Sequence, residues 1–432
     1  MEYISIIILV LSFLALMGIG VPVAWSLGIA SFITLLVSVA FVPSATTIAQ
    51  RMGTGLDSFA LLAIPFFVLA GEIMNKGGIA NRLIELAKAF TGRLPGGLLY
   101  VNVIAAMLFG AIAGSAAAAV SAIGGILGER MDKEGYPKSL GAAVNITSST
   151  TGLIIPPSNI LIVYSLASGG VSIAALFLAG YIPGIFIGLV LMLTAAIFIR
   201  KHKLPAGEVT TMRELGEKFW RAFPSLLLLF IVIGGIVGGV FTATEASAIA
   251  VVYTLGLSFF YKELTAKDLP KILLKSSETT AIVMLLIATS MSMSWVMSSE
   301  NIPQSISESL LSLSDNIIVI LIIINVLLLF VGIFMDMTPA VLIFTPIFLP
   351  IVTALGVDPV HFGIIMILNL CIGLCTPPVG SVLFLGVQVA QTSIQKVIKP
   401  MVPFFIAMIL GLIVVTLWPG LTLWLPRLFG LV

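Results

Sequence analysis

The stretch GLIIPPSNILIV, residues 152–163, places two adjacent prolines inside a strongly apolar run. A second stretch, GLCTPPVGSVLF at residues 373–384, repeats the arrangement of a Gly-Leu pair, two further residues and then Pro-Pro. Proline removes a backbone donor and clashes with the preceding helical turn. The two stretches therefore predict two helices that are interrupted inside hydrophobic segments.

The composition around these stretches indicates a membrane protein. Apolar residues make up 59% of the 432 residues, charged residues only 9%, and the mean hydropathy is +1.20. A soluble domain is about one quarter charged, and many apolar runs here reach the roughly 20 residues that span a bilayer. Because the runs are continuous rather than alternating, they favour helices over the strands of a membrane barrel. We expect an all-α polytopic membrane protein.

The apolar runs fall into three kinds. Two runs, 139–168 and 360–392, contain the Pro-Pro breaks, and two more, 96–128 and 316–352, are too long for one crossing. The remaining runs predict single spans at 4–20, 22–42, 58–75, 172–199, 222–240, 244–260, 276–298 and 401–418.

The basic residues predict how the long runs sit in the bilayer. Nineteen of the 21 Lys and Arg residues lie in a few short segments, of which 76–95 and 129–138 flank the run 96–128. Cytoplasmic segments carry the excess of Lys and Arg, so this run must enter and leave on the cytoplasmic side, as a re-entrant hairpin with its tip near Gly114–Ser115. Neither flank of 316–352 is basic, which predicts a hairpin from the opposite side with its tip at 336–338. About ten crossings remain.

The two halves of the chain have the same order of features. A shift of 221 residues superimposes the first Gly-Leu and Pro-Pro on the second, and a shift of 222 places Gly110 on Gly332. Five predicted crossings separate the hairpins, which inverts the second unit and predicts an inverted-topology repeat, as in many secondary transporters. We expect two scaffold parts and two repeat cores, with boundaries at 1–95, 96–200, 201–315 and 316–432.

An interrupted helix in a membrane needs partners for its free carbonyl groups. In hydrocarbon each unsatisfied group costs several kcal/mol. A bound cation satisfies such carbonyls, and half-helix N-termini suit anions. The alternative is a proline kink whose carbonyls are satisfied by neighbouring helices. Two breaks at matched positions beside matched hairpins favour the ion-binding interpretation.

Few polar residues lie inside the predicted spans, so each is a candidate for function. Asp336 lies at a predicted hairpin tip with no basic residue near it in sequence, and an intramembrane acid of this kind marks a functional site. No Lys or Arg lies in a predicted span core, so an anionic substrate would meet helix N-termini, hydroxyl groups and bound cations. Some of the polar residues near the first break could instead bond only neighbouring helices; they are Asn145, Thr147, Ser148, Ser149, Thr150, Thr151, Ser158 and Asn159.

Several long motifs resemble the large membrane subunit of TRAP (tripartite ATP-independent periplasmic) transporters, the DctM-like family. The resemblance covers essentially the whole chain and rests on LLAIPFFVLAGEIMNKGG (61–78), IAGSAAAA (112–119), GLIIPPSNILIVYSLASGGVSIAALFLAG (152–180), FMDMTPAVLIFTPIFLPI (334–351) and GLCTPPVGSVLF (373–384). It implies an ion-transporter-superfamily fold, an elevator mechanism and Na⁺-coupled uptake of organic acids across a bacterial inner membrane. It also implies a small four-helix membrane subunit (DctQ-like) and a periplasmic substrate-binding protein (DctP-like) as partners.

The same resemblance implies two sodium sites at the hairpin tips and Pro-Pro breaks, with substrate between them. For sodium the matched residues are Gly114, Ser115, Gly152, Pro156, Asp336, Thr338, Gly373, Thr376 and Pro377. For substrate they are Ser115, Asn145, Ser158, Asn159, Asp336 and Ser381. No cofactor beyond Na⁺ as coupling ion and no nucleic acid is expected.

Other functions are weighed against this one. A stand-alone Na⁺-coupled anion symporter of the same architecture would need no binding protein. An intramembrane enzyme lacks support, because HExxH and GxSxG are absent, and the missing GxxxxGK[ST] excludes a P-loop ATPase in this chain. A channel fits broken helices at a repeat interface less well than alternating access does. Sugar acids and C4-dicarboxylates both remain open as substrates.

Overall fold

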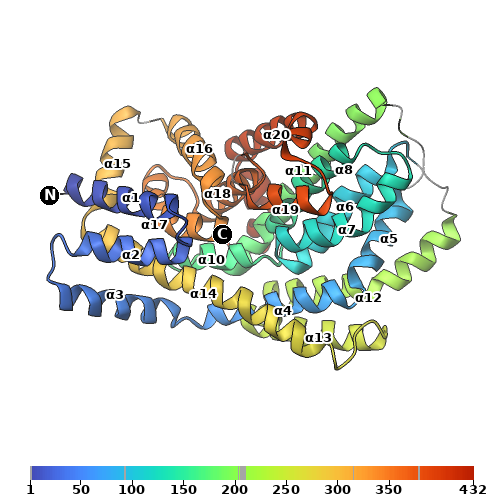
Figure 1. Ribbon diagram of the computed structural model, residues 1–432, viewed down its shortest axis with the longest axis horizontal. Helices are drawn as coiled ribbons and strands as arrows, with labels where there is room; N and C mark the ends of the chain where they lie inside the picture. The colour runs from blue at the N-terminus through green and yellow to red at the C-terminus, as the bar shows by residue number, and fades with distance from the viewer. Residues whose placement is uncertain (1, 92–93, 203, 205–210, 315, 378–379) are drawn as a thin grey trace.

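The fold is known from a computed structural model, which describes residues 2–91, 94–202, 204, 211–314, 316–377 and 380–432 (Figure 1). Within these residues the secondary structure is helical, without strands. The helices of the first half are α1 (Glu2–Gly18), α2 (Val23–Leu35), α3 (Phe41–Leu56), the 3₁₀ helix η1 (Phe59–Leu62), α4 (Ala63–Lys76), α5 (Ile79–Thr91), α6 (Gly97–Ala113), α7 (Ala116–Lys133), α8 (Lys138–Ser149), α9 (Thr151–Ile154), α10 (Asn159–Ala167) and α11 (Ile173–His202). Those of the second half are α12 (Met212–Val237), α13 (Ala243–Phe260), α14 (Leu269–Ser299), α15 (Ile302–Leu313), α16 (Ile317–Phe334), α17 (Met337–Ala354), α18 (Pro359–Leu374), α19 (Ser381–Val389), α20 (Ile394–Leu417) and α21 (Gly420–Leu428).

Both long apolar runs are broken into helix pairs near the predicted tips. The run 96–128 becomes α6 and α7, which pack on each other, and the run 316–352 becomes α16 and α17, which also make contact. The Pro-Pro runs become α8–α9 with α10, and α18 with α19. The first of these bends by 52° at its break. Pro378 lies outside the described residues.

The helices form an outer layer and an inner group. In the outer layer α14 packs along α2, α3 and α4, and α13 packs on α4; these helices run across the lower side of Figure 1. The inner group holds both hairpins and both broken helices, with α11, α20 and α21 packed among them. Several contacts in the inner group join the two halves of the chain. In two of them α19 packs on α7, and α10 packs on α17. Each broken helix therefore sends its second segment to the hairpin of the other half.

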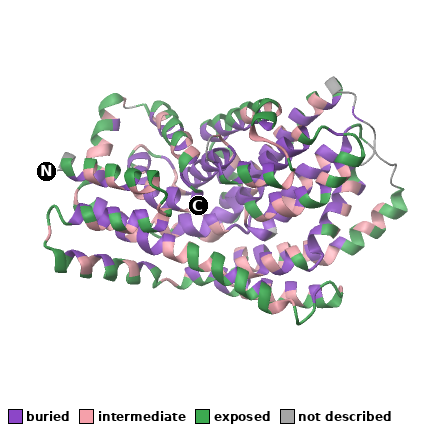
Figure 2. Cartoon of the chain, viewed as in Figure 1, coloured by how far each residue is buried: buried purple, intermediate pink, exposed green. Residues whose placement is uncertain are grey.

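Burial follows this arrangement. Figure 2 shows buried residues concentrated in the inner group and exposed residues along the outermost helices. Many exposed side chains are large and apolar, among them Phe230 (73% exposed), Val252 (72%) and Phe330 (63%). Such side chains are unfavourable in water and suit contact with lipid. The chain is a polytopic all-α membrane protein.

Among the described helices, eight are long and apolar enough to cross a bilayer, or nine if α8–α9 and α10 form one bent span. These eight include α16 and α17, both members of the second predicted hairpin, while α1, α2 and α18 are apolar but shorter. Length and composition therefore do not assign the re-entrant segments, and the figure of ten crossings stays a prediction.

Local capping sets the starts of α12 and α13, and the apolar pattern misses the first of these. The chain begins α12 at Met212, ten residues before the predicted span at 222–240, because Thr211 and Glu214 form a capping box there. Thr242 and Glu245 form the same reciprocal pair at the start of α13. In a capping box the two side chains satisfy backbone donors that have no partner inside the helix.

Candidate functional site

The first hairpin tip is built by a glycine and a serine. Gly114 ends α6 with φ of 59°, in the left-handed region that glycine adopts without a steric cost. Ser115 then starts α7 as its N-cap, and its Oγ accepts from the backbone N–H of Ala118 at 3.3 Å. These two residues end α6 and begin α7, so the turn between the two helices is only two residues long.

The second hairpin tip carries an acid in place of the glycine. Asp336 is the N-cap residue of α17, so its carboxylate lies at the positive end of that helix. Its Oδ1 accepts a long hydrogen bond of 3.4 Å from Ser381 Oγ, at the start of α19. No ion pair reaches Asp336 within the described part of the chain.

The hydroxyl groups at the two breaks are largely satisfied by their own helices. Ser158 Oγ donates to the Leu153 carbonyl at 2.6 Å, and Thr376 Oγ1 donates to the Ile372 carbonyl at 2.8 Å. Thr147, Ser148, Ser149, Thr150 and Thr151 also donate to carbonyl groups three or four residues earlier. The dense polar cluster at the first break thus bonds mostly to its own backbone.

A central cavity of about 190 Å³ lies where both tips and both breaks meet. Its lining includes five of the predicted residues with polar side chains, together with Gly114; the polar ones are Ser115, Asn159, Asp336, Thr338 and Ser381. Asn159 Oδ1 is buried, and no described residue forms a hydrogen bond with it. No Lys or Arg is among the lining residues that the structure describes.

A smaller cavity of about 140 Å³ lies beside the second tip. Gly332, Met335 and Leu374 contribute to its wall, and Asp336 and Ser381 line both this cavity and the central one. Carboxylate, hydroxyl and carbonyl oxygens are the ligands of hard cations. The surroundings of Asp336 therefore fit a cation, since the carboxylate has no basic partner there.

The remaining predicted residues lie outside the central cavity. Gly152 packs against Gly110, and Gly373 packs against Gly332, in two close backbone contacts at matched positions of the two halves. Pro156, Ser158, Thr376 and Pro377 lie in the breaks without lining the cavity, and Asn145 lines a different cavity at the far end of α7.

Sequence reasoning missed the wall that the outer layer provides. Ile64 and Val68 of α4 and Thr279 and Val283 of α14 line the central cavity opposite the hairpin tips. Thr279 belongs to the polar run SSETT at 276–280, at the start of the predicted span 276–298, which is the signal that could have found it. The cavity thus lies between the outer layer and the inner group.

The spans define a polytopic membrane protein, and comparisons with known proteins define its class as a transporter. The family model of the tripartite ATP-independent periplasmic transporter, DctM component, matches residues 10–421. The chain therefore belongs to the DctM family of TRAP transporter large permeases.

Two relatives support this assignment, and one solved structure has a similar fold. The C4-dicarboxylate TRAP transporter large permease protein DctM of Rhodobacter capsulatus is 38% identical, with 97% of this chain and 98% of that protein covered. The isethionate TRAP transporter permease protein DctMQ of Oleidesulfovibrio alaskensis is 39% identical over 93% of this chain and 63% of that protein. The YdaH transporter of Alcanivorax borkumensis has a similar fold at 13% identity, with a TM-score of 0.67, over 89% of this chain and 90% of that one.

Proposed function

We propose that this chain is the large permease subunit of a tripartite secondary transporter that takes up organic acids together with Na⁺. Asp336 supports the coupling ion, because its carboxylate faces a cavity without Lys or Arg among the described lining residues. An unpaired charge at membrane depth is costly, and Na⁺ beside Asp336 supplies the missing positive charge. The bound cation and the hydroxyl groups of Ser115 and Ser381 then attract the carboxylate of the substrate.

The layered arrangement supports an elevator mechanism. In this proposal the inner group, an inverted-topology repeat, moves across the bilayer against the outer layer. The central cavity suits such a motion, since its two walls come from the two parts: α4 and α14 on one side, hairpin tips and breaks on the other. Movement of one part past the other exposes the cavity to opposite sides of the membrane in turn.

Partners and location follow from the family. The DctMQ name of the isethionate relative, which is longer than this chain, fits a large permease joined to a small membrane subunit. We propose that this chain works in a bacterial inner membrane with a separate small four-helix subunit and a periplasmic substrate-binding protein. The second candidate is a stand-alone Na⁺-coupled anion symporter of the same architecture.

Uptake into proteoliposomes tests the proposal. With the partner proteins present, uptake of a C4-dicarboxylate or sugar acid should follow a Na⁺ gradient, ignore ATP and move more than one Na⁺ per substrate. Undiminished uptake in Na⁺-free buffer would refute Na⁺ coupling, and full uptake without the binding protein would favour the stand-alone symporter.

The Asp336→Asn variant tests the residue that carries the proposal. Asparagine keeps the shape and removes the charge, so uptake should fall and the half-saturating Na⁺ concentration should rise about tenfold or more, at unchanged expression. Loss of a charged partner at a desolvated site typically costs about 2–5 kcal/mol. Asp358→Asn is the matched control, because Asp358 caps α18 through the Val360 N–H, away from the cavity. Wild-type Na⁺ dependence in Asp336→Asn would assign the carboxylate a structural role.

A further inference from the structure

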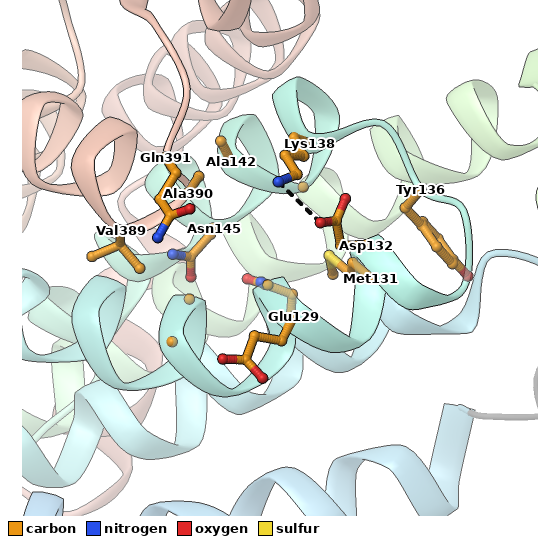
Figure 3. Close-up of a pocket in the computed structure, with 15 residues that line it drawn as sticks. Glu129, Met131, Asp132, Tyr136, Lys138, Ala142, Asn145, Val389, Ala390 and Gln391 are labelled. Atoms are coloured by element: carbon orange, nitrogen blue, oxygen red, sulfur yellow. Dashed lines mark ion pairs between the residues drawn. The ribbon is translucent and has the colours of Figure 1, made fainter.

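A second cavity of about 280 Å³ lies at the other end of the first hairpin. The C-terminal part of α7, the start of α8 and the end of α19 surround it (Figure 3). No described residue lines both this cavity and the central one. The proposed uptake mechanism therefore makes no use of it.

Its inner end holds a buried amide with an unused acceptor. Asn145 is 3% exposed, and its Nδ2 donates to the Val120 carbonyl at 2.8 Å. Gly124 gives the amide its place, because a Cβ there would collide with Asn145 Nδ2. The Asn145 Oδ1 has no hydrogen-bond partner among the described residues, and a buried acceptor without a partner costs about 1–3 kcal/mol. A bound ligand would remove that cost.

The charges at the outer rim leave a net negative site. Lys138 and Asp132 form an ion pair of 3.0 Å and cancel each other. Glu129 is on the rim, and no ion pair of the described residues includes it. Burial raises the pKa of Tyr136 to about 12, so this phenol is neutral at pH 7. The rim therefore carries one carboxylate without an ion-pair partner among the described residues.

Gln391 adds a second amide at some conformational cost. It follows the end of α19 with φ of 49°, in the left-handed region, where glycine is the usual residue. Glycine would end α19 at lower conformational cost. We therefore expect the Gln391 side chain to have a function of its own. Figure 3 shows Gln391 beside Asn145, with Glu129 on the other side of Asn145.

We propose that this cavity binds an alkali metal cation, Na⁺ or K⁺, separately from the central site. Asn145 Oδ1 and the Gln391 amide oxygen supply neutral ligands, and Glu129 supplies the negative charge, a set of hard oxygens that suits such ions. The cavity is several times the roughly 30 Å³ of one water molecule, so the ion keeps part of its hydration shell. The bound ion would tie the end of α19, from the second half of the chain, to α7 and α8 of the first.

Protection of a cysteine inside the cavity tests this site without measuring uptake. Ala390→Cys, in a background with Cys371→Ala and Cys375→Ala, places a thiol on the cavity wall. Alkylation of the purified protein is compared in NaCl, KCl and N-methyl-D-glucamine chloride at equal ionic strength. At saturating salt Na⁺ or K⁺ should slow the reaction about threefold or more, as mass action requires for an occupied site.

Variants assign the protection to this cavity. Glu129→Gln and Gln391→Gly should remove it, and Gln391→Gly should do so without lowering the thermal unfolding midpoint, because glycine relieves the left-handed backbone. Glu134→Gln, a matched change on the adjoining exposed turn, and Asp336→Asn, at the central cavity, should both keep it. Equal alkylation rates in all three salts would overturn the proposal. Protection that survives Glu129→Gln and is lost in Asp336→Asn would also overturn it, by assigning the effect to the central site.

Discussion

At the residue scale, Glu85 of α5 joins two helices that are remote in sequence. Its carboxylate pairs with Arg130 of α7 at 3.1 Å and with Lys218 of α12 at 3.2 Å. Partial burial raises the pKa of Glu85, but the hydrogen bonds from both basic groups outweigh it and leave the pKa below the ordinary 4.5. The cluster therefore stabilises the fold when Glu85 is ionised.

The Glu85→Gln variant should show this in the pH dependence of stability. A lowered pKa gives a contribution that is present above pH 4.5 and is lost as the pH falls through the folded-state pKa. The variant should thus unfold at a lower temperature than the wild type at pH 7, by an amount worth under about 1 kcal/mol because the pair is partly exposed. In detergent-solubilised protein the difference should shrink as the pH falls below 4.5 and vanish below the folded-state pKa of Glu85.

The control for this prediction is Glu217→Gln. Glu217 pairs with Arg213 on the surface of one helix at 3.5 Å, and both side chains are largely exposed. Its removal should leave the unfolding temperature nearly unchanged at either pH. Equal effects of the two variants at pH 7 would contradict the assignment of Glu85 as a link between helices.

The polar half of the site could be predicted from single residues, whereas its apolar half could not. Asp336, Ser115 and Ser381 stand out because polar groups and helix breaks are rare in spans, and the structure brings them together. Ile64 and Val68 have no such signal, since an apolar side chain that faces a cavity reads like one that faces lipid. Asn145 shows the opposite error: its polar side chain was predicted at the central site, but it lines a separate cavity.

At the element scale, one close contact between two glycines holds each hairpin against its broken helix. A Cβ on Gly110 would lie 2.5 Å from the Cα of Gly152, and one on Gly332 would lie 3.1 Å from the Cα of Gly373. Contact between backbones leaves no flexible side chain to give way. These contacts let the breaks approach the hairpins.

Alanine at these positions should destabilise the protein in a fixed order. Gly110→Ala should lower the thermal unfolding midpoint most and Gly332→Ala less, since overpacking typically costs about 1–3 kcal/mol and the second contact is looser. Gly256→Ala on α13 is the control, because no described atom beyond the local turn of its own helix lies within 4 Å of the added Cβ and alanine favours a helix. A loss for Gly256→Ala as large as that for Gly110→Ala would contradict the close-contact explanation.

Helices formed by long apolar runs were predictable from the sequence, and helices that lie between the spans were not. The chain forms α3 over FVPSATTIAQRMGTGL and α15 over IPQSISESLLSL, both half polar. No side-chain cap marks the start of either helix. Their stability comes from packing, of α3 on α14 and of α15 on α17, which a sequence pattern does not show.

At the scale of the whole molecule, the order of hairpin, broken helix and following span was readable from the offset of about 221 residues. What the offset could not give is the exchange across the halves, in which α19 packs on α7 and α10 on α17. That exchange places both tips against one cavity. It depends on three-dimensional packing between segments at least 170 residues apart, for which a single sequence carries no pattern.

The predicted sidedness of the molecule can be tested with two exposed positions. Lys133, at the end of α7, lies in a basic segment expected in the cytoplasm, and Ser312, on α15, lies in a segment without Lys or Arg expected in the periplasm. Both side chains are exposed in the fold. A difference in labelling therefore reports the side of the membrane and not burial.

Single cysteines at Lys133 and Ser312, in a background lacking Cys371 and Cys375, should react differently with a membrane-impermeant thiol reagent. The Ser312→Cys protein should be labelled from outside in spheroplasts, and the Lys133→Cys protein only after the membrane is permeabilised. The reason is that segments rich in Lys and Arg stay on the cytoplasmic side of the membrane. The segments 76–95 and 129–138 flank α6 and α7. If cysteines at Lys88 and at Lys133 are both found on the cytoplasmic side, the first hairpin must leave the membrane on the side from which it enters. Labelling of Lys133→Cys and Ser312→Cys to the same extent from outside would rule that hairpin model out.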